Sequence, residues 1–159
     1  IFDGIFEGIK IKSIGSSAFY SSNFSGELSL PVCTYIGYAA FYSSNFSGSL
    51  NLPVCTYVGS AAFFNSNFSG SLSLPVCTSI WNSAFANSNF SGSLDLPMCT
   101  YIGVAALANS NFSQISIGAN AELYCDCIGA NSAEFINDYV ANGKLAGTYV
   151  WDGQHWIYQ

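Results

Sequence analysis

A five-residue motif recurs along this chain at a constant step of 22 positions. It reads Leu-Pro-Val-Cys-Thr from Leu30, Leu52 and Leu74, and Leu-Pro-Met-Cys-Thr from Leu96. Most positions between these anchors repeat as well. A fixed period of this length indicates a stack of one supersecondary unit, because a single unit cannot bury its own apolar face. The period therefore predicts a solenoid, in which like side chains form ladders instead of converging on a catalytic centre.

The apolar positions within one unit predict a short strand followed by a second buried segment. Leu50 and Leu52 flank a polar residue, which is typical of a strand with one buried face. A proline follows each such strand and ends its pairing. The second apolar segment of the same unit contains Val58, Ala62 and Phe63. Phenylalanine also recurs at positions 24, 46, 68, 90 and 112, and we expect this column to lie inside the stack.

The repeat has a recognisable consensus. Leu-x-Leu-x-x-Cys matches the central part of the leucine-rich repeat pattern. The longer run Pro-x-Cys-Thr-x-Ile-Gly-x-x-Ala-Phe resembles the BspA-like subfamily of leucine-rich repeats, with Cys33, Cys55, Cys77 and Cys99 in place of a valine. The resemblance covers roughly residues 9–117 in five units. It implies a right-handed solenoid of short parallel strands with an irregular convex side. It also implies a bacterial or protist protein at the extracellular or cell surface that acts in adhesion and host contact.

The repeat pattern stops after Phe112, and the chain divides into two predicted segments. Residues 1–117 contain the solenoid, with about five 22-residue repeats of which the first is partial. Residues 118–159 form a C-terminal cap, which a stack of this kind needs in order to cover the open end of its core. The chain starts at Ile1 inside a partial repeat, so we interpret it as a processed product or a fragment of a longer protein.

The first element of the predicted cap is a helix. Asn131 and Glu134 have the spacing of a capping box, and Asn142 followed by Gly143 is typical of a helix end. We therefore expect a helix over about 132–142. One apolar stripe along it is formed by four residues, namely Phe135, Ile136, Tyr139 and Val140.

A hairpin over about 148–158 is predicted next, because Asp152 and Gly153 form the favoured dipeptide of a two-residue type I′ turn. His155, the only histidine, lies in this hairpin. General-base catalysis needs a positioned partner, and no Ser or Cys nucleophile is marked by its context. No calcium loop or phosphate-binding glycine motif occurs either. The sequence therefore favours a protein that is not an enzyme and has no cofactor and no metal.

Charged residues are scarce, which limits the classes of partner. The chain of 159 residues has three lysines, no arginine and nine acidic residues, for a net charge of -6. So few cations cannot neutralise a run of phosphates, which argues against nucleic acid and against anionic membrane surfaces. No apolar run reaches the length of a membrane span, so membrane insertion is not expected. Low charge opposes self-association only weakly, and self-association stays open.

Two structural ladders are expected from the repeat. The column Cys33, Cys55, Cys77 and Cys99 is interpreted as buried free thiols, since a linear ladder suits neither the torsion of a disulfide nor a tetrahedral metal. Cys125-x-Cys127 lies outside this column, and pairing or soft-metal binding stays open there. Asn-Phe-Ser, which fits the N-glycosylation pattern, recurs at Asn23, Asn45, Asn67, Asn89 and Asn111. Because a glycan on every coil would be crowded, we favour a stacked amide ladder over glycosylation.

The candidate ligand-binding residues are the outward ladders. They comprise Tyr35, Tyr57 and Tyr101, together with Asn51, Ser73 and Asp95 on the strand face. Tyrosine has a rigid flat body with a polar tip, which suits contact with a protein or a glycan. The alternative interpretation is that these tyrosines only shield the coil edges. The sequence thus favours a non-catalytic recognition or adhesion module, and the alternative is a structural subunit of a fibre, sheath or surface layer.

Overall fold

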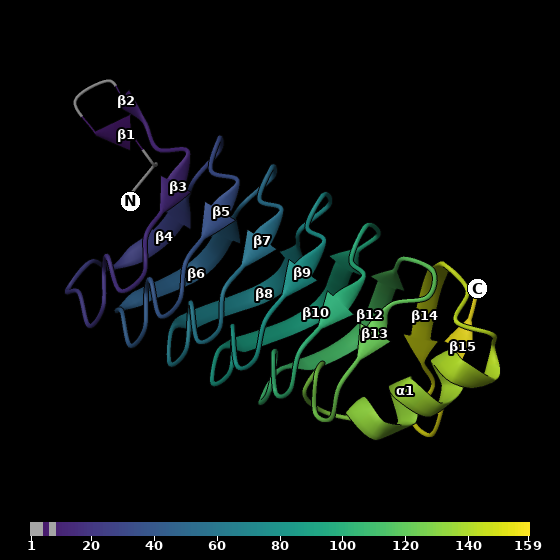
Figure 1. Cartoon of the computed structure of the whole chain (residues 1–159). Helices are drawn as coiled ribbons and strands as arrows, with labels where there is room; N and C mark the ends of the chain where they lie inside the picture. Colours follow the sequence, from purple (N-terminus) through teal and green to yellow (C-terminus); the bar gives the residue numbers. More distant parts are fainter. Residues whose placement is uncertain (1–4, 7–8) are drawn as a thin grey trace.

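The structure, a computed structural model, describes residues 5–6 and 9–159. The chain forms a β-solenoid in which the coils contribute long strands to one parallel sheet and short strands to another (Figure 1). The long strands are β4 Gly26–Ser29, β6 Phe46–Asn51, β8 Asn67–Ser73, β10 Asn89–Leu96 and β12 Asn111–Ile117. The short strands are β3 Ser13–Ile14, β5 Tyr35–Ile36, β7 Tyr57–Val58, β9 Ser79–Ile80, β11 Tyr101–Ile102 and β13 Glu122–Leu123.

The long and short strands lie on two sides of one core. In Figure 1 the long strands pass behind the short ones, and successive coils wind in a right-handed sense, as predicted. Before the first short strand, β1 Ile5–Phe6 and β2 Ile9–Lys10 pair antiparallel. The part of the predicted partial repeat that falls on residues 1–4 and 7–8 lies outside the described residues.

The side opposite the long strands is more regular than the sequence predicts. An irregular convex side is expected there, whereas the structure has a six-stranded parallel sheet of two-residue strands. In five of these strands the second residue, Ile36 for example, is buried and the first faces outward; in β13 the second residue, Leu123, is partly buried. Most coils have the same length, so their backbones stay in register and pair even over two residues. This sheet continues to β13 and therefore extends past residue 117, where the sequence places the start of the cap.

The core consists of stacked columns of identical or similar side chains. The two leucines of each long strand are buried, as is the phenylalanine column at Phe46, Phe68, Phe90 and Phe112. Ring centroids in this column are 6.2 Å apart between Phe46 and Phe68 and between Phe68 and Phe90. The prediction of an inward phenylalanine column is therefore correct for four of its five members. Phe24, on the first long-strand coil, is 47% exposed, since fewer coils cover it.

The return loops between short and long strands are also bonded from coil to coil. Two non-glycine residues per coil have positive φ in these loops, for example Ala39 at 49° and Ser43 at 50°. This geometry directs the N–H groups of alternate residues towards the next coil. Phe41 N–H donates to Ala62 O at 2.7 Å, and Ser43 N–H donates to Phe64 O at the same distance. The backbone of a whole coil is thus tied to its neighbours, and side chains at equivalent positions form straight columns.

The cap begins with the helix α1 Ser132–Ala141, at the predicted place but with a different N-terminus. Asn131 has φ 58° and makes no side-chain capping bond, so the predicted capping box is wrong. The left-handed backbone at Asn131 turns the chain sharply, and its side chain cannot reach the first turn. The end at Gly143 is as predicted, with φ 71° and a bond from Lys144 N–H to Tyr139 O of 2.9 Å.

The helix and a hairpin together cover the last coil. The hairpin strands are β14 Gly147–Trp151 and β15 Trp156–Tyr158, and β14 pairs antiparallel with β12. Phe135 and Tyr139 of the helix are fully buried and pack edge-to-face on Tyr149 of β14. Val140, expected in the same apolar stripe, is 53% exposed, so that part of the prediction is wrong.

The hairpin turn differs from the predicted two-residue type I′ turn. Trp151 pairs with Trp156, which leaves a four-residue loop between them. Asp152 Oδ1 accepts the N–H groups of Gln154 and His155, both at 2.8 Å. These bonds hold the pKa of Asp152 below its usual value. An aspartate that caps the backbone two and three residues ahead stabilises a wider turn, because its carboxylate replaces part of the strand pairing.

Candidate functional site

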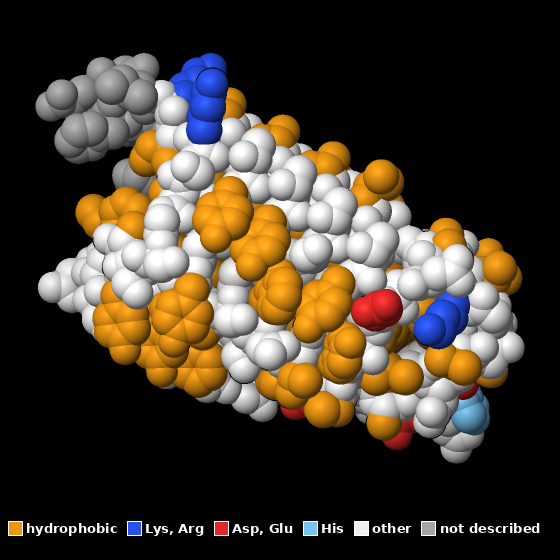
Figure 2. Space-filling view, in the orientation of Figure 1, with side chains coloured by type: hydrophobic (Ala, Val, Ile, Leu, Met, Phe, Trp, Pro, Cys, Tyr) orange, Lys and Arg blue, Asp and Glu red, His pale blue; other side chains and the backbone are white. Residues whose placement is uncertain are grey.

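The short-strand sheet carries a continuous column of five exposed or half-buried aromatic side chains. We call this column the aromatic ladder; it consists of Tyr35, Tyr57, Trp81, Tyr101 and Tyr124. Ring centroids of successive members are 4.9, 6.1, 5.1 and 5.3 Å apart. Figure 2 shows hydrophobic side chains in a row along this face, over the strands β5, β7, β9 and β13. The three predicted tyrosines therefore belong to one surface.

Two members of the aromatic ladder occupy a different position of the repeat from the other three. The first residue of the short strand is Tyr35, Tyr57 or Tyr101 in three coils, but Ser13, Ser79 or Glu122 in the other three. In the coils of Ser79 and Glu122 an aromatic residue, Trp81 or Tyr124, stands two positions later, where the other coils have glycine; the first coil has Gly15 there and contributes no ring to the ladder. The backbone hydrogen bonds confirm that Tyr124 occupies the glycine position. The N–H groups of Gly103 and Tyr124 each donate to the isoleucine carbonyl of the preceding coil.

Trp81 lies between Gly59 and Gly103 in the stack. A Cβ at either glycine would meet the preceding coil, since Gly37 C lies 2.8 Å from the Cβ position of Gly59 and Asn82 N lies 2.8 Å from that of Gly103. The rings of Tyr35 and Tyr57 are nearly parallel, at 9°, whereas Trp81 is tilted by 46° and 40° relative to its neighbours. Trp81 is 38% exposed and therefore offers apolar surface to solvent.

A threonine column runs beside the aromatic ladder. Its members are Thr34, Thr56, Thr78 and Thr100, all exposed. Each hydroxyl donates to a carbonyl of the preceding coil, for example Thr56 Oγ1 to Thr34 O at 3.0 Å. The hydroxyl groups are thus partly satisfied within the stack, which makes this face less polar than its composition suggests. The threonine column and the aromatic ladder together are called the short-strand face below.

The polar candidates lie on the other sheet. Asn51 Nδ2 donates to Ser29 Oγ at 2.9 Å, and Ser73 Oγ donates to Asp95 Oδ2 at 3.0 Å. These side chains project from the long strands, so the core separates them from the aromatic ladder. The structure therefore divides the predicted ligand-binding residues between two surfaces. On the long-strand surface the polar groups bond mainly to one another along the columns.

The cysteine column is buried and its thiols are free. Each Sγ donates to the backbone carbonyl two residues ahead, at 3.3 Å from Cys55 to Tyr57 O. Burial raises the pKa of Cys55 to about 12 and that of Cys99 to about 11. These thiols stay protonated at neutral pH and are poor nucleophiles. Cys125 and Cys127 are also unpaired; the first is exposed and the second is buried.

Hydrogen-bonded asparagine amides occur two residues before the expected position. Asn87 Nδ2 donates to Asn65 Oδ1 at 2.7 Å, and Asn109 Nδ2 donates to Asn87 Oδ1. The asparagines of the Asn-Phe-Ser motifs, expected to form this ladder, are instead exposed at the start of the long strands or just before them: Asn23, Asn45, Asn67, Asn89 and Asn111. Strand geometry turns these side chains outward, whereas the loop at Asn65 and Asn87 has positive φ and aligns the amides along the stack. Glycosylation of the exposed asparagines stays a prediction.

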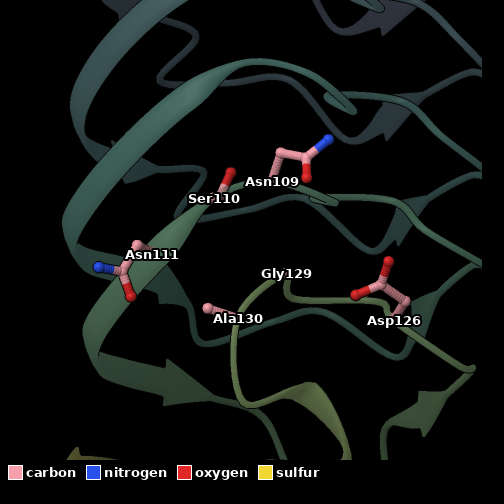
Figure 3. Close-up of a pocket in the computed structure, with 6 residues that line it drawn as sticks. All are labelled: Asn109, Ser110, Asn111, Asp126, Gly129 and Ala130. Carbon is pink, nitrogen blue, oxygen red and sulfur yellow. The ribbon is translucent and has the colours of Figure 1, made fainter.

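A polar cavity of about 360 Å³ lies where the last return loop meets the cap. Its lining residues, shown in Figure 3, are Asn109, Ser110, Asn111, Asp126, Gly129 and Ala130. The side chains of Asn111 and Asp126 lie on opposite sides of the Gly129 backbone and do not converge. Asp126 is the one ionisable group in this lining. The described residues contain no group of three or more His, Cys, Asp or Glu side chains placed to hold a metal ion.

Comparison with known protein families gives one match, to the BspA type Leucine rich repeat region, in six copies over residues 10–132. This count equals the number of short strands, whereas sequence analysis predicts about five repeats. Neither the comparison with curated proteins nor that with solved structures gives a match. Within the described part of the chain, no helix is both long and apolar enough to cross a membrane.

Proposed function

Because the chain belongs to the BspA-type leucine-rich repeat family, we propose that it is a non-catalytic adhesion module of the extracellular or cell surface. The repeat stack is its binding scaffold, and the ligand is a protein or a glycan on another surface. One observation carries this proposal: the aromatic ladder is continuous from the second coil to the sixth, although two of these coils lack the usual tyrosine. Buried packing does not require this continuity, because the rings project outward from the sheet.

The distribution of reactive groups supports a binding role over catalysis. His155 Nδ1 lies 3.4 Å from Asp138 Oδ1 in the cap, and the histidine side chain is 66% exposed. A general base of this kind needs a nucleophile or a substrate pocket beside it. In the hairpin, the backbone N–H of His155 donates to Asp152 Oδ1 at 2.8 Å and its carbonyl accepts Asp152 N–H at 3.1 Å, so these neighbours stabilise the turn. The short-strand face instead presents a continuous row of exposed or half-buried rings, which suits a macromolecular partner.

The experiment compares binding of the wild type and of Trp81→Ser to an immobilised panel of matrix proteins, glycans and the chain itself. Trp81 lies at the centre of the aromatic ladder, so we expect its loss to weaken binding to the true ligand at least about tenfold. Tyr42→Ser is the matched control, because Tyr42 stacks at 4.8 Å on Tyr20 in a separate column on the return loops. Binding that survives Trp81→Ser, or that Tyr42→Ser weakens equally, would contradict the proposal.

A further inference from the structure

We propose that the aromatic ladder binds a second copy of this chain, docked antiparallel across the short-strand face. The inference rests on the proposed function, since it names the protein ligand of the same surface. Adhesion would then be homophilic: modules on two opposed surfaces would join through identical faces. Three features of the face lead to this partner, namely its charges, its repeat and the placement of its largest ring.

Opposite charges mark the two ends of the short-strand face. Lys12 is exposed on the first coil, where its carbonyl accepts Thr34 N–H at 2.8 Å. Glu122 is exposed on the sixth coil, where its N–H donates to Thr100 O at 2.9 Å. The chain between them has two charged residues, Glu27 and Asp95, and both belong to long strands. The face therefore carries Lys12 at one end and Glu122 at the other and is neutral between them; Lys144 of the cap, whose carbonyl accepts Asn120 N–H at 2.9 Å, lies beside the Glu122 end.

This distribution is complementary to itself in one orientation. A two-fold axis between the third and fourth coils places Lys12 of each copy opposite Glu122 of the other. Because such an interface is isologous, the ion pair forms twice. Parallel docking would instead oppose lysine to lysine and glutamate to glutamate, which like-charge repulsion disfavours. The charges thus select the antiparallel orientation.

The repeat keeps the other coils in register in the same arrangement. Both copies have the same spacing between neighbouring strands, about 4.8 Å, so coils that match at the axis also match at the ends. Tyr57 then faces Trp81 beside the axis, and Tyr35 faces Tyr101 one coil further out. Tryptophan and tyrosine at the centre of an interface are the residues that contribute most to binding. The tilted, uncovered indole of Trp81 lies at that centre.

A standard interface buries about 800 Å² per partner, which is about a ninth of the 7165 Å² that this chain exposes. The short-strand face spans six coils and includes both columns. Its neutral interior avoids the desolvation of unpaired charges on docking, and the two ion pairs lie at the rim, where charge sets orientation.

The test uses charge reversal and sedimentation equilibrium over protein concentrations of about 1 to 500 µM. We expect the wild type to dimerise reversibly, and Lys12→Glu and Glu122→Lys each to weaken dimerisation about tenfold or more. An equimolar mixture of these two variants should regain wild-type affinity, because each then presents the charges that the other needs. Glu134→Lys is the matched control for Glu122→Lys, since it changes the net charge equally but lies on the cap helix.

Several results would overturn the inference. A wild type that stays monomeric throughout, reversals without effect, or a mixture that fails to regain affinity would each do so. Dimerisation that Trp81→Ser leaves unchanged would also contradict it, because another surface would then mediate the contact. If the wild type is monomeric but binds a glycan or another protein through Trp81, the proposed function stands and only the homophilic partner is wrong. Circular dichroism melts confirm that each variant is folded.

Discussion

Replacing Phe68 by alanine should destabilise the solenoid more than any single surface change. Phe68 is fully buried at the middle of the phenylalanine column. Its ring stacks on Phe46 and Phe90 at 6.2 Å and meets Phe63 edge-to-face at 5.8 Å. The coils above and below cannot collapse into the resulting cavity, because their own backbone bonds fix their spacing.

The expected cost follows from this environment. Buried Phe→Ala changes cost about 3–5 kcal/mol, and we expect the upper half of that range because three ring contacts are lost together. A domain of this size is stable by about 5–15 kcal/mol. With an m value of about 2 kcal/mol/M, the urea midpoint should fall by about 2–2.5 M. Equilibrium unfolding in urea, followed by circular dichroism, measures this shift directly.

Phe24→Ala is the internal comparison, because Phe24 belongs to the same column but is 47% exposed. The same atoms are removed where roughly half of the ring already contacts solvent, so the cost should be about half as large. If Phe68→Ala lowers the midpoint no more than Phe24→Ala, the column does not stack as described. The argument that coil stacking supplies the stability would then fail.

Three further predictions concern the thiols and the cap. Without denaturant, a thiol reagent should rapidly label Cys125 alone, since the other cysteines are buried; rapid labelling of four or more, seen by mass spectrometry, would contradict that burial. The thiol contribution to the free energy of unfolding should be constant below about pH 9 and fall as pH rises towards 11, by about 1.4 kcal/mol per pH unit for each thiol concerned. The reason is that a thiol in the unfolded chain has its ordinary pKa of 9.0 and deprotonates first, whereas burial raises the pKa of Cys99 to about 11 in the folded protein. Urea titrations at several pH values measure this loss of stability. A free energy of unfolding that does not change between pH 9 and 11 would refute the prediction. Asp138→Ala should cost about 1.5–3 kcal/mol, because Asp138 Oδ2 accepts Trp156 N–H at 2.7 Å and joins helix to hairpin; unchanged thermal stability would show that this bond contributes little.

The sequence predicts best what every coil shares. The leucine, phenylalanine and cysteine columns are identical from coil to coil, so their period alone assigns them to the core. The order of a solenoid followed by a helix and a hairpin follows from the point where that period stops. These features depend on burial, which a repeated apolar pattern reports directly.

Features that depend on a single coil or on backbone conformation are harder to predict. Trp81 stands where other coils have glycine, and only the structure shows that it replaces the tyrosine missing at Ser79. The signal in the sequence is that Ser79 and Trp81, two departures from the repeat, occur in the same coil. At Asp152 the side chain accepts hydrogen bonds from two backbone N–H groups and so stabilises a wider turn. The preference of the Asp-Gly dipeptide for a two-residue turn does not take these bonds into account. At Asn131 the spacing to Glu134 predicts a capping box, but the left-handed backbone leaves the asparagine side chain without a capping hydrogen bond.

The antiparallel attachment of β14 to β12 has a consequence for assembly. Elongation of a filament by end-on addition requires a free edge that can accept another strand in the same direction as the last one. Here that edge is consumed by a strand running the opposite way, and the three-residue β15 beyond it gives little length for pairing. Parallel continuation of the long-strand sheet therefore stops at β12, and end-on growth on this side would need contacts other than a further parallel strand of this sheet.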